Sequence, residues 1–328
     1  MSPLFRRRSE EEKATDKAAE QARRDGAERA AERSAASLQQ IEAGHIPLEA
    51  SERLSQFTAS DAGAAPFSSD LRVSDWSALA RLGIAPITQV MGSSIYHVGW
   101  QPTYYNTPSE VRALSDAYNE CRRLALGRLL EESQACAADA VVSLQIDQGA
   151  HDWAPGALEF IAIGTAVRLP PQMRDPRGLT VLSDLSGQEF TQLCHAGTRP
   201  VGIAAHTSVH YVPASPATQM AQSSFGGSWS GQAGSWANQE LVDFSQGVYE
   251  AREKAIASIT AQVRELGGDG IIGVELREHG RTHAVRRGMF DAKDLEVTFH
   301  VMGTVIREDA ELASQPPQQP PLKILSLN

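Results

Sequence analysis

The chain has 328 residues, of which 41% are hydrophobic and 21% charged, and it carries a net charge of −10. This composition is typical of a soluble globular protein with room for two domains, and the acidic charge argues against general nucleic-acid binding. We find no signal peptide and no apolar run near the ~20 residues that cross a bilayer, so a cytoplasmic location is expected. The three cysteines (Cys121, Cys136 and Cys194) are too scattered for a disulfide framework, which also fits a reducing compartment.

Residues 1–40 are rich in alanine and in charges of both signs, with few larger apolar side chains. High helix propensity without an apolar face predicts a tail that is helical or disordered and lies outside the fold. An alternative role for this tail is weak contact with an anionic membrane surface or a partner. The residues that would make this contact are Phe5, Arg6, Arg7 and Arg8.

The first domain is expected over residues 75–170, after a linker with one short helix at 41–74. A helix is predicted at 118–136, followed by a buried strand of mostly aliphatic residues at 140–146. A pair of strands is expected on either side of Met91-Gly92, and one more strand closes the domain. These three strands are Ile84–Val90, Ser93–Gly99 and Leu158–Arg168.

A second domain is expected over residues 187–309, after a proline-containing linker at 171–186. A glycine- and serine-rich segment predicts a flexible loop at 214–245 inside this domain. The last residues, 310–328, are rich in proline and are expected to be a disordered tail.

The helix and strand of the second domain repeat those of the first. From Val248 to Leu266 apolar residues follow a 3.6-residue period, and Gly267 supplies the positive φ that ends a helix. At an offset of 130 residues four positions are identical, and they pair Glu120, Arg122, Ala125 and Asp139 with Glu250, Arg252, Ala255 and Asp269. We therefore predict an α+β fold with two tandem copies of a β-β-α-β-β unit.

Two motifs of the second domain, GGDGIIGV at 267–274 and GTVIR at 303–307, resemble those of the YbjQ-like family, to which heavy-metal binding is ascribed. The first domain carries the related ADAVV at 138–142 and GTAVR at 164–168. The resemblance implies that each unit lays its helix across an antiparallel sheet. It also implies self-association, since single-copy members of the family assemble as rings of subunits.

Asp139 and Asp269 are candidate site residues at matching helix-to-strand junctions. An aspartate there usually accepts backbone N–H groups in a turn, and a functional role is the alternative. A second group of residues lies on or just after predicted strands and could line either a ligand pocket or a subunit interface. Its members are Tyr96, His97, Trp100, His210 and Tyr211.

A divalent metal ion is the one cofactor that the resemblance implies. The cysteines are neither paired nor at matching positions, and His206 and His210 lie on a predicted strand, where four residues span ~13 Å. The remaining candidate is the trio His279, His283 and His300, because the first two are expected in a loop that could approach the last strand. We nevertheless expect no preformed chelating site.

No nucleophile elbow, P-loop, paired CxxC or HExxH motif is present, so enzymatic activity has the least support. The sequence therefore favours a cytoplasmic binding or scaffolding protein that forms homo-oligomers and binds an unknown small ligand. The alternatives are a heavy-metal-binding protein that uses the second-domain histidines and an enzyme with a site between the two copies.

Overall fold

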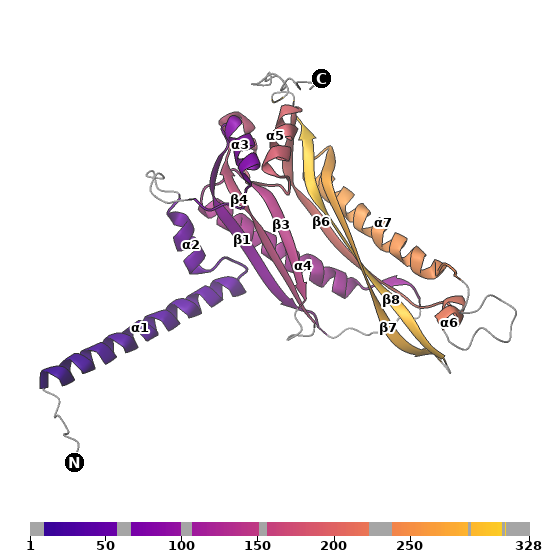
Figure 1. Ribbon diagram of the computed structural model, residues 1–328, viewed down its shortest axis with the longest axis horizontal. Helices are drawn as coiled ribbons and strands as arrows, with labels where there is room; N and C mark the ends of the chain where they lie inside the picture. The colour runs from indigo at the N-terminus through magenta and orange to yellow at the C-terminus, as the bar shows by residue number, and fades with distance from the viewer. Residues whose placement is uncertain are drawn as a thin grey trace, which may run out of the picture.

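The computed structural model describes residues 10–57, 67–99, 107–150, 156–222, 238–287, 290–309 and 312. The fold is α+β, as predicted, with two four-stranded sheets that lie next to each other (Figure 1). Sheet A has the strand order β1 (Ala85–His97), β4 (Ala157–Arg168), β3 (Ala140–Ala150) and β5 (Val181–Leu182). Sheet B has the order β2 (Ser109–Glu110), β6 (Thr198–Val212), β8 (Phe290–Glu308) and β7 (Gly270–Arg287).

Helices cover these sheets and extend from them. They are α1 (Glu10–Glu42), α2 (Leu48–Ser55), α3 (Val73–Arg81), α4 (Arg112–Ala135), α5 (Gly187–His195), α6 (Pro216–Gln222) and α7 (Val242–Glu265), with a short 3-10 helix η1 at Pro171–Met173. We call residues 73–168 the first unit and residues 187–308 the second unit. Both units run through helix, strand, long helix and two strands, and the sheet orders β1-β4-β3 and β6-β8-β7 correspond.

One expected hairpin is a single strand. The sequence predicted two strands around Met91-Gly92, but β1 runs unbroken through both residues, with Gly92 opposite Ala162 of β4. The glycine is needed for a close crossing, because a Cβ at this position would lie 2.0 Å from the backbone oxygen of Ala125 in α4. Gly92 therefore lets α4 lie directly on sheet A, and the expected turn was wrong.

The long helices begin earlier than predicted, at Arg112 and Val242, but end within a residue of the expected positions. The strand after α7 is longer than expected. The loop predicted around His279 and His283 is wrong, since β7 continues to Arg287 and pairs with β8 along its whole length. The outer part of this hairpin is polar on both faces, so it lacks the apolar alternation by which a strand is recognised.

The expected linker at 171–186 is also part of the fold. Its β5 pairs in parallel with the start of β3, and Met173, Val181 and Leu185 are buried. These residues join one apolar cluster with α3 and α5, so the segment closes the end of sheet A. Similarly, the loop expected at 214–245 contains α6 and the start of α7, and its residues 223–237 lie outside the described part of the chain.

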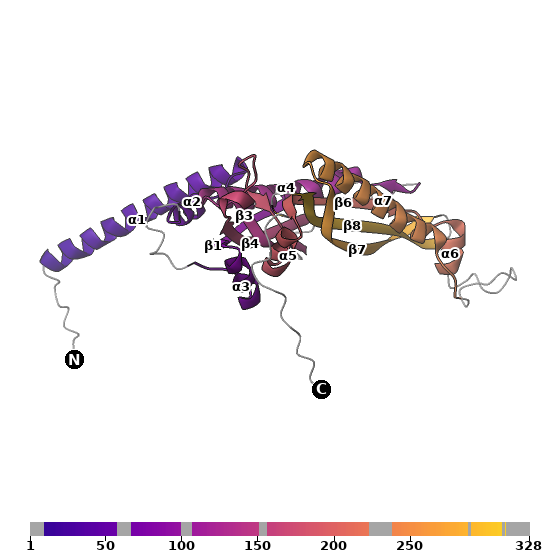
Figure 2. The same ribbon diagram turned by 90° about the horizontal axis from the view of Figure 1, so that it is seen from above.

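The helix α1 extends away from the rest of the molecule in both views (Figures 1 and 2). Its attachment within the described residues is at its C-terminal end, where the Ser37 hydroxyl donates to Glu49 of α2 at 2.7 Å and accepts from the Leu48 N–H at 3.2 Å. The tail is thus helical from residue 10 to 42, whereas Phe5 to Arg8 lie outside the described residues.

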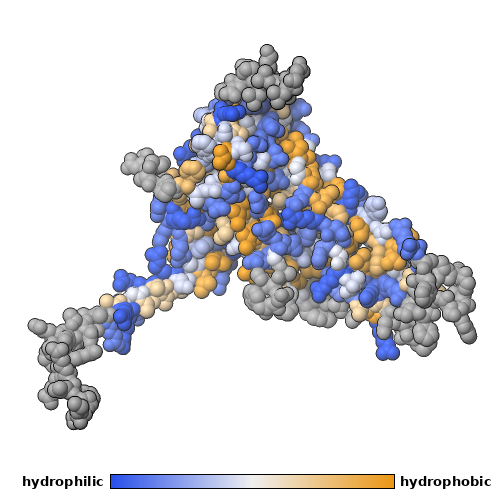
Figure 3. All heavy atoms as spheres, viewed as in Figure 1, coloured by the Kyte–Doolittle hydropathy of each residue, from blue (hydrophilic) through white to orange (hydrophobic). Residues whose placement is uncertain are grey.

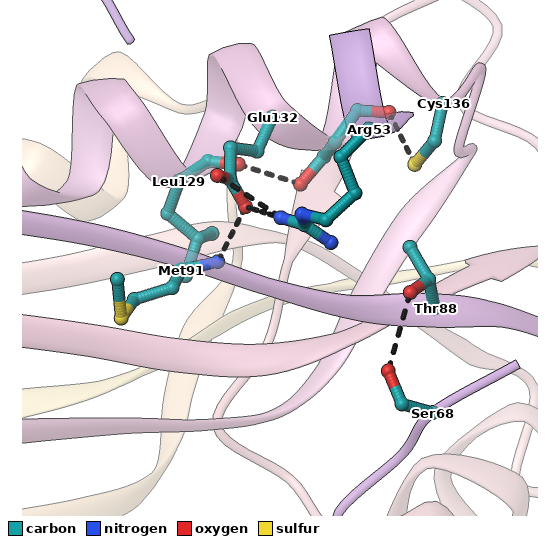
Figure 4. Close-up of polar contacts among 8 residues, drawn as sticks. Arg53, Ser68, Thr88, Met91, Leu129, Glu132 and Cys136 are labelled. Atoms are coloured by element: carbon teal, nitrogen blue, oxygen red, sulfur yellow. Dashed lines mark hydrogen bonds and ion pairs between the residues drawn. The ribbon is translucent and has the colours of Figure 1, made fainter. Parts of the chain in front are cut away.

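The helix α2 is attached to the first unit by the buried carboxylate of Glu132 on α4. This carboxylate accepts the Met91 N–H at 2.8 Å and the Arg53 guanidinium at 3.3 Å (Figure 4). Burial raises the pKa of Glu132. One side chain therefore links α2, α4 and β1.

Candidate functional site

The helix α4 lies between the two units. One face packs into the core of sheet A through Cys121, Ala125 and Leu129. The opposite face binds β6, where Asn119 accepts the Thr207 N–H and donates to the Thr207 carbonyl, both at 2.9 Å. The first unit therefore binds strand β6 of sheet B through its helix, and Val209 and Tyr211 of β6 pack with Leu114 and Tyr118 of α4.

A cavity of about 50 Å³ lies at this junction. We call it the interface cavity. Its lining comes from both units and consists of Arg122, Ile146, Gln148, Phe160, Glu275, Arg277, His300, Val301 and Met302. A site between the two units is one of the alternatives that the sequence leaves open, and this cavity combines charged with apolar lining residues.

Arg122 is the most buried charge at this junction, with 6% of its surface exposed. Its Nη1 donates to the Thr207 hydroxyl at 2.7 Å, its Nη2 donates to the Asn119 side-chain oxygen, and its guanidinium lies 5.9 Å from the Phe160 ring centre. Burial lowers its pKa to about 10, so it remains cationic at neutral pH. Among the described residues no carboxylate pairs with it.

His300 of β8 lies next to Arg122. Its Nδ1 is 2.9 Å from the Thr207 hydroxyl, and its ring packs edge-on against Tyr118 at 5.4 Å. Burial, followed by the positive charges of Arg122 and Arg277, lowers the pKa of His300 to about 4. The imidazole is therefore neutral at neutral pH.

The histidine trio does not converge on one point. The three histidines share a face of the β7–β8 pair. His279 lies opposite Thr298, His283 opposite Asp294, and His300 opposite Arg277. His279 and His283 are separated along a straight strand, as His206 and His210 are on β6, and four strand residues span ~13 Å. His283 instead contacts Glu296 at 3.2 Å.

The expected pocket residues are distributed over both faces of the two sheets. Tyr96 packs on the α4 side of β1, His97 is exposed on the other side, and Trp100 lies outside the described residues. His210 is buried on the α7 side of β6, where neither ring nitrogen has a hydrogen-bond partner among the described residues. Tyr211 points to the opposite side and donates to Asp294 at 2.6 Å.

Asp139 and Asp269 hold equivalent turns. The Asp139 carboxylate accepts the Leu169 N–H at 2.8 Å, and the Asp269 carboxylate accepts the Glu308 N–H at 2.9 Å. Each also donates its own N–H to a carbonyl on the last strand of its unit, at Val167 of β4 and Ile306 of β8. These contacts agree with the turn interpretation of the two aspartates.

The cysteines are poor candidates for metal binding. All three are buried and free, and burial raises the pKa of Cys136 to about 11 and that of Cys194 to about 12. Metal binding needs the thiolate, which these environments disfavour. In the part of the chain that the structure describes, no three His, Cys, Asp or Glu side chains are grouped to hold a metal ion.

Sequence reasoning missed the cavity but not all of its residues. Arg122 is one of the positions that are identical at the offset of 130 residues, and His300 is one of the metal candidates. Nothing in the spacing places them together, because 178 residues separate them and they meet only through the packing of α4 on sheet B.

Comparison with known proteins identifies the family of a domain in the first unit. Residues 106–170 match the YbjQ family, described as "Putative heavy-metal-binding". A UPF0145 protein of Clostridium novyi is 38% identical over 60 residues, which cover 18% of this chain and 56% of that protein. A UPF0145 protein of Methanococcus vannielii is 40% identical over 60 residues, which cover 18% of this chain and 55% of that protein. The chain thus contains a YbjQ-family domain, as the resemblance predicted, although the family match does not extend to the second unit.

A longer relative is the encapsulin nanocompartment protein Rv1762c of Mycobacterium tuberculosis. It is 31% identical over 261 residues, which cover 79% of this chain and 90% of that protein. The chain belongs to the same family as this mycobacterial protein. No solved structure matches the chain significantly. Within the described residues, no helix is both long and apolar enough to span a membrane.

Proposed function

We propose that the chain is a self-assembling structural protein built from two copies of one YbjQ-like unit, and that chains join head to tail. The observation that carries this proposal is the contact between α4 and sheet B inside the chain. In this contact the first unit contributes its long helix, α4, and the second unit contributes its sheet, sheet B. The long helix of the second unit, α7, and the sheet of the first unit, sheet A, are therefore left without such a partner.

The duplication is supported by unusual backbone positions. Ala137 and Ser143 have positive φ values of 53° and 54° although neither is glycine, and at the offset of 130 the equivalents are Gly267 at 71° and Gly273 at 63°. A side chain in this conformation costs about 1–2 kcal/mol, so two such coincidences support a common ancestral backbone. The matching turns at Asp139 and Asp269 support it as well.

The free sheet is the face of sheet A that points away from α4. By strand equivalence, Ser93 and Ile95 correspond to Thr207 and Val209, the residues of β6 that α4 covers. On sheet A this face is open and apolar: Met91 is 47% and Ile95 57% exposed. Apolar residues (orange) interrupt the polar surface over sheet A in Figure 3.

The free helix is the outer face of α7. Tyr249 and Arg252 occupy the positions equivalent to Asn119 and Arg122, and Tyr249 is 65% exposed. An aromatic residue on an open helix face is typical of a buried contact in an assembly. We therefore propose that α7 of one chain lies on the open face of sheet A in the next chain.

A head-to-tail contact of this kind is heterologous and generates a closed ring or an open filament. The 31% identity to a protein named for an encapsulin nanocompartment supports membership of a multi-chain assembly. The ring assembly implied by the YbjQ resemblance agrees with the same geometry.

Disulfide trapping tests the contact. Ser93→Cys with Tyr249→Cys places thiols at the proposed junction between chains, and the matched control is Thr207→Cys with Asn119→Cys at the equivalent junction within one chain. We expect oxidation to give a ladder of linked chains for the first pair and an internal link for the second. The native cysteines are buried and should not interfere. If only the control pair forms a disulfide, the proposed contact is wrong.

Light scattering gives an independent measurement. The wild-type mass should be a multiple of 35.4 kDa. Ile95→Glu should reduce that mass, because it places a charge in the contact, whereas Leu276→Glu, at an exposed position on the edge strand β7 of sheet B, should not. A wild-type protein that stays monomeric over a hundredfold range of concentration would exclude self-assembly.

Heavy-metal binding is the second candidate function, and the family match at residues 106–170 is the observation that favours it. The candidate ligands for this alternative are His279, His283 and His300, which would have to rearrange to hold one ion because they do not converge in the structure. Titration calorimetry of metal-stripped protein with zinc and with copper tests it. Submicromolar binding that His279→Ala or His283→Ala abolishes would support this function over a purely structural one.

A further inference from the structure

We propose that the interface cavity binds a small anion through a carboxylate or phosphate group, and that Arg122 is its principal ligand. This inference concerns the junction inside one chain, so it does not depend on the self-assembly proposed above. It is based on an uncompensated buried charge, a set of converging donors and a cavity of matching size.

The first observation is the charge. A buried guanidinium needs a counter-charge or a full set of hydrogen bonds, since burial removes the water that would otherwise solvate it. Arg122 has five N–H groups, and the described residues accept two of them, both through neutral oxygens. Glu275 lines the same cavity but is bonded to Arg277 at 2.7 Å. An anion in the cavity would supply the missing acceptor.

The second observation is the orientation of His300. The Thr207 hydroxyl accepts from Arg122 and lies 2.9 Å from Nδ1 of His300, to which it can direct its own proton. In the tautomer in which Nδ1 accepts that proton, the neutral ring carries its own proton on Nε2 and is a hydrogen-bond donor there. Gln148 adds an amide and Arg277 a second guanidinium to the lining. The cavity thus combines several hydrogen-bond donors with the apolar side chains of Ile146, Phe160 and Val301.

The third observation is size. A volume of about 50 Å³ accommodates a few water molecules, because one water needs ~10–15 Å³ of such space. This is room for the charged end of a small molecule or for a free oxyanion. The planar guanidinium fork matches the two oxygens of a carboxylate or phosphate. Because the lining comes from both units, the bound anion would hold them together.

Titration calorimetry in chloride buffer tests the proposal, with inorganic phosphate and acetate as separate probes at constant ionic strength. We expect saturable binding of one anion per chain for at least one probe. The preferred probe distinguishes a phosphate site from a carboxylate site. Each probe should also raise the Tm of the wild-type protein in proportion to its affinity, by mass action.

Three variants identify the ligands. Arg122→Met should reduce affinity at least tenfold, and Arg277→Gln, on an exposed strand, should reduce it several-fold without affecting folding. The control Arg264→Gln removes the same charge from the exposed side of α7 and should leave binding unchanged. If Arg122→Met does not fold, the affinity of Arg277→Gln still tests whether the anion binds in the interface cavity. The proposal is overturned if neither probe binds saturably, or if Arg264→Gln weakens binding as much as Arg277→Gln.

Discussion

Gly92 shows how one residue can determine the packing of a whole unit. It has no side chain at the point where α4 crosses β1, and an added methyl group would clash with the backbone of α4 rather than with a movable side chain. Since backbone cannot yield without moving the helix, this position tolerates only glycine. The same helix contains Gly127, which is exposed and has no atom within 4 Å of the site a Cβ would occupy.

This pair of glycines yields matched predictions. Gly92→Ala should destabilise the protein by at least about 2 kcal/mol, because overpacking forces the helix away from the sheet. Gly127→Ala should instead stabilise it by about 0.5–1 kcal/mol, since alanine is the better residue in a helix interior. Guanidinium denaturation of both variants measures the difference. Equal effects would show that α4 does not approach β1 as closely as described.

Among the secondary-structure elements, α1 differs most from its surroundings. Its N-terminal part has no described contact with the two units, whereas its last turns pack on α2 through Ser37 and through an ion pair between Arg33 and Glu52 at 2.6 Å. Exposed ion pairs of this kind contribute little, so the attachment depends mainly on the buried end near Ile46.

Two truncations separate the parts of α1. Deleting residues 1–30 should leave the Tm unchanged, because no core residue is removed. Deleting residues 1–42 should lower the Tm by roughly 2–4 °C, because it removes the contacts that hold α2 in place. Differential scanning calorimetry of both truncated chains checks this. A large loss of stability in the shorter deletion would mean that the exposed part of α1 docks elsewhere.

For the whole molecule, the two units are joined by a shared core as well as by α4. Phe190 of α5, at the start of the second unit, is 1% exposed and packs in one cluster with Leu79, Ile84 and Val167 of the first unit. Leu312, after the last strand, belongs to the same cluster. The boundary between the units therefore crosses a core, and they should not unfold separately.

Phe190→Ala tests this coupling. Loss of a buried aromatic ring costs about 3–5 kcal/mol, and we expect one calorimetric transition that shifts as a whole to lower temperature. The control Leu179→Ala removes an exposed side chain and should change little. A transition that splits in two, with one part unmoved, would show that the units are independent.

Local patterns were sufficient to predict the α+β class, the ends of the long helices, the strand around His206 and His210, and the family of residues 106–170. These features depend on periodicity and on turn residues, which act over a few positions. The hairpin at Gly92 and the loop at His279 were mispredicted for the converse reason. A glycine in the sequence does not distinguish a turn from a close crossing of helix and strand. The polar part of β7 has no apolar alternation, so it is recognised as a strand only from its pairing with β8 in the structure.

The interface cavity depended entirely on long-range packing. Arg122, Thr207 and His300 come from three elements and two units, and no local spacing relates them. The sequence predicted a repeated unit, but it did not indicate that the helix of one unit would pack against strand β6 of the other. That arrangement follows from burial of apolar faces across the whole chain, which buries a charged arginine between the two units.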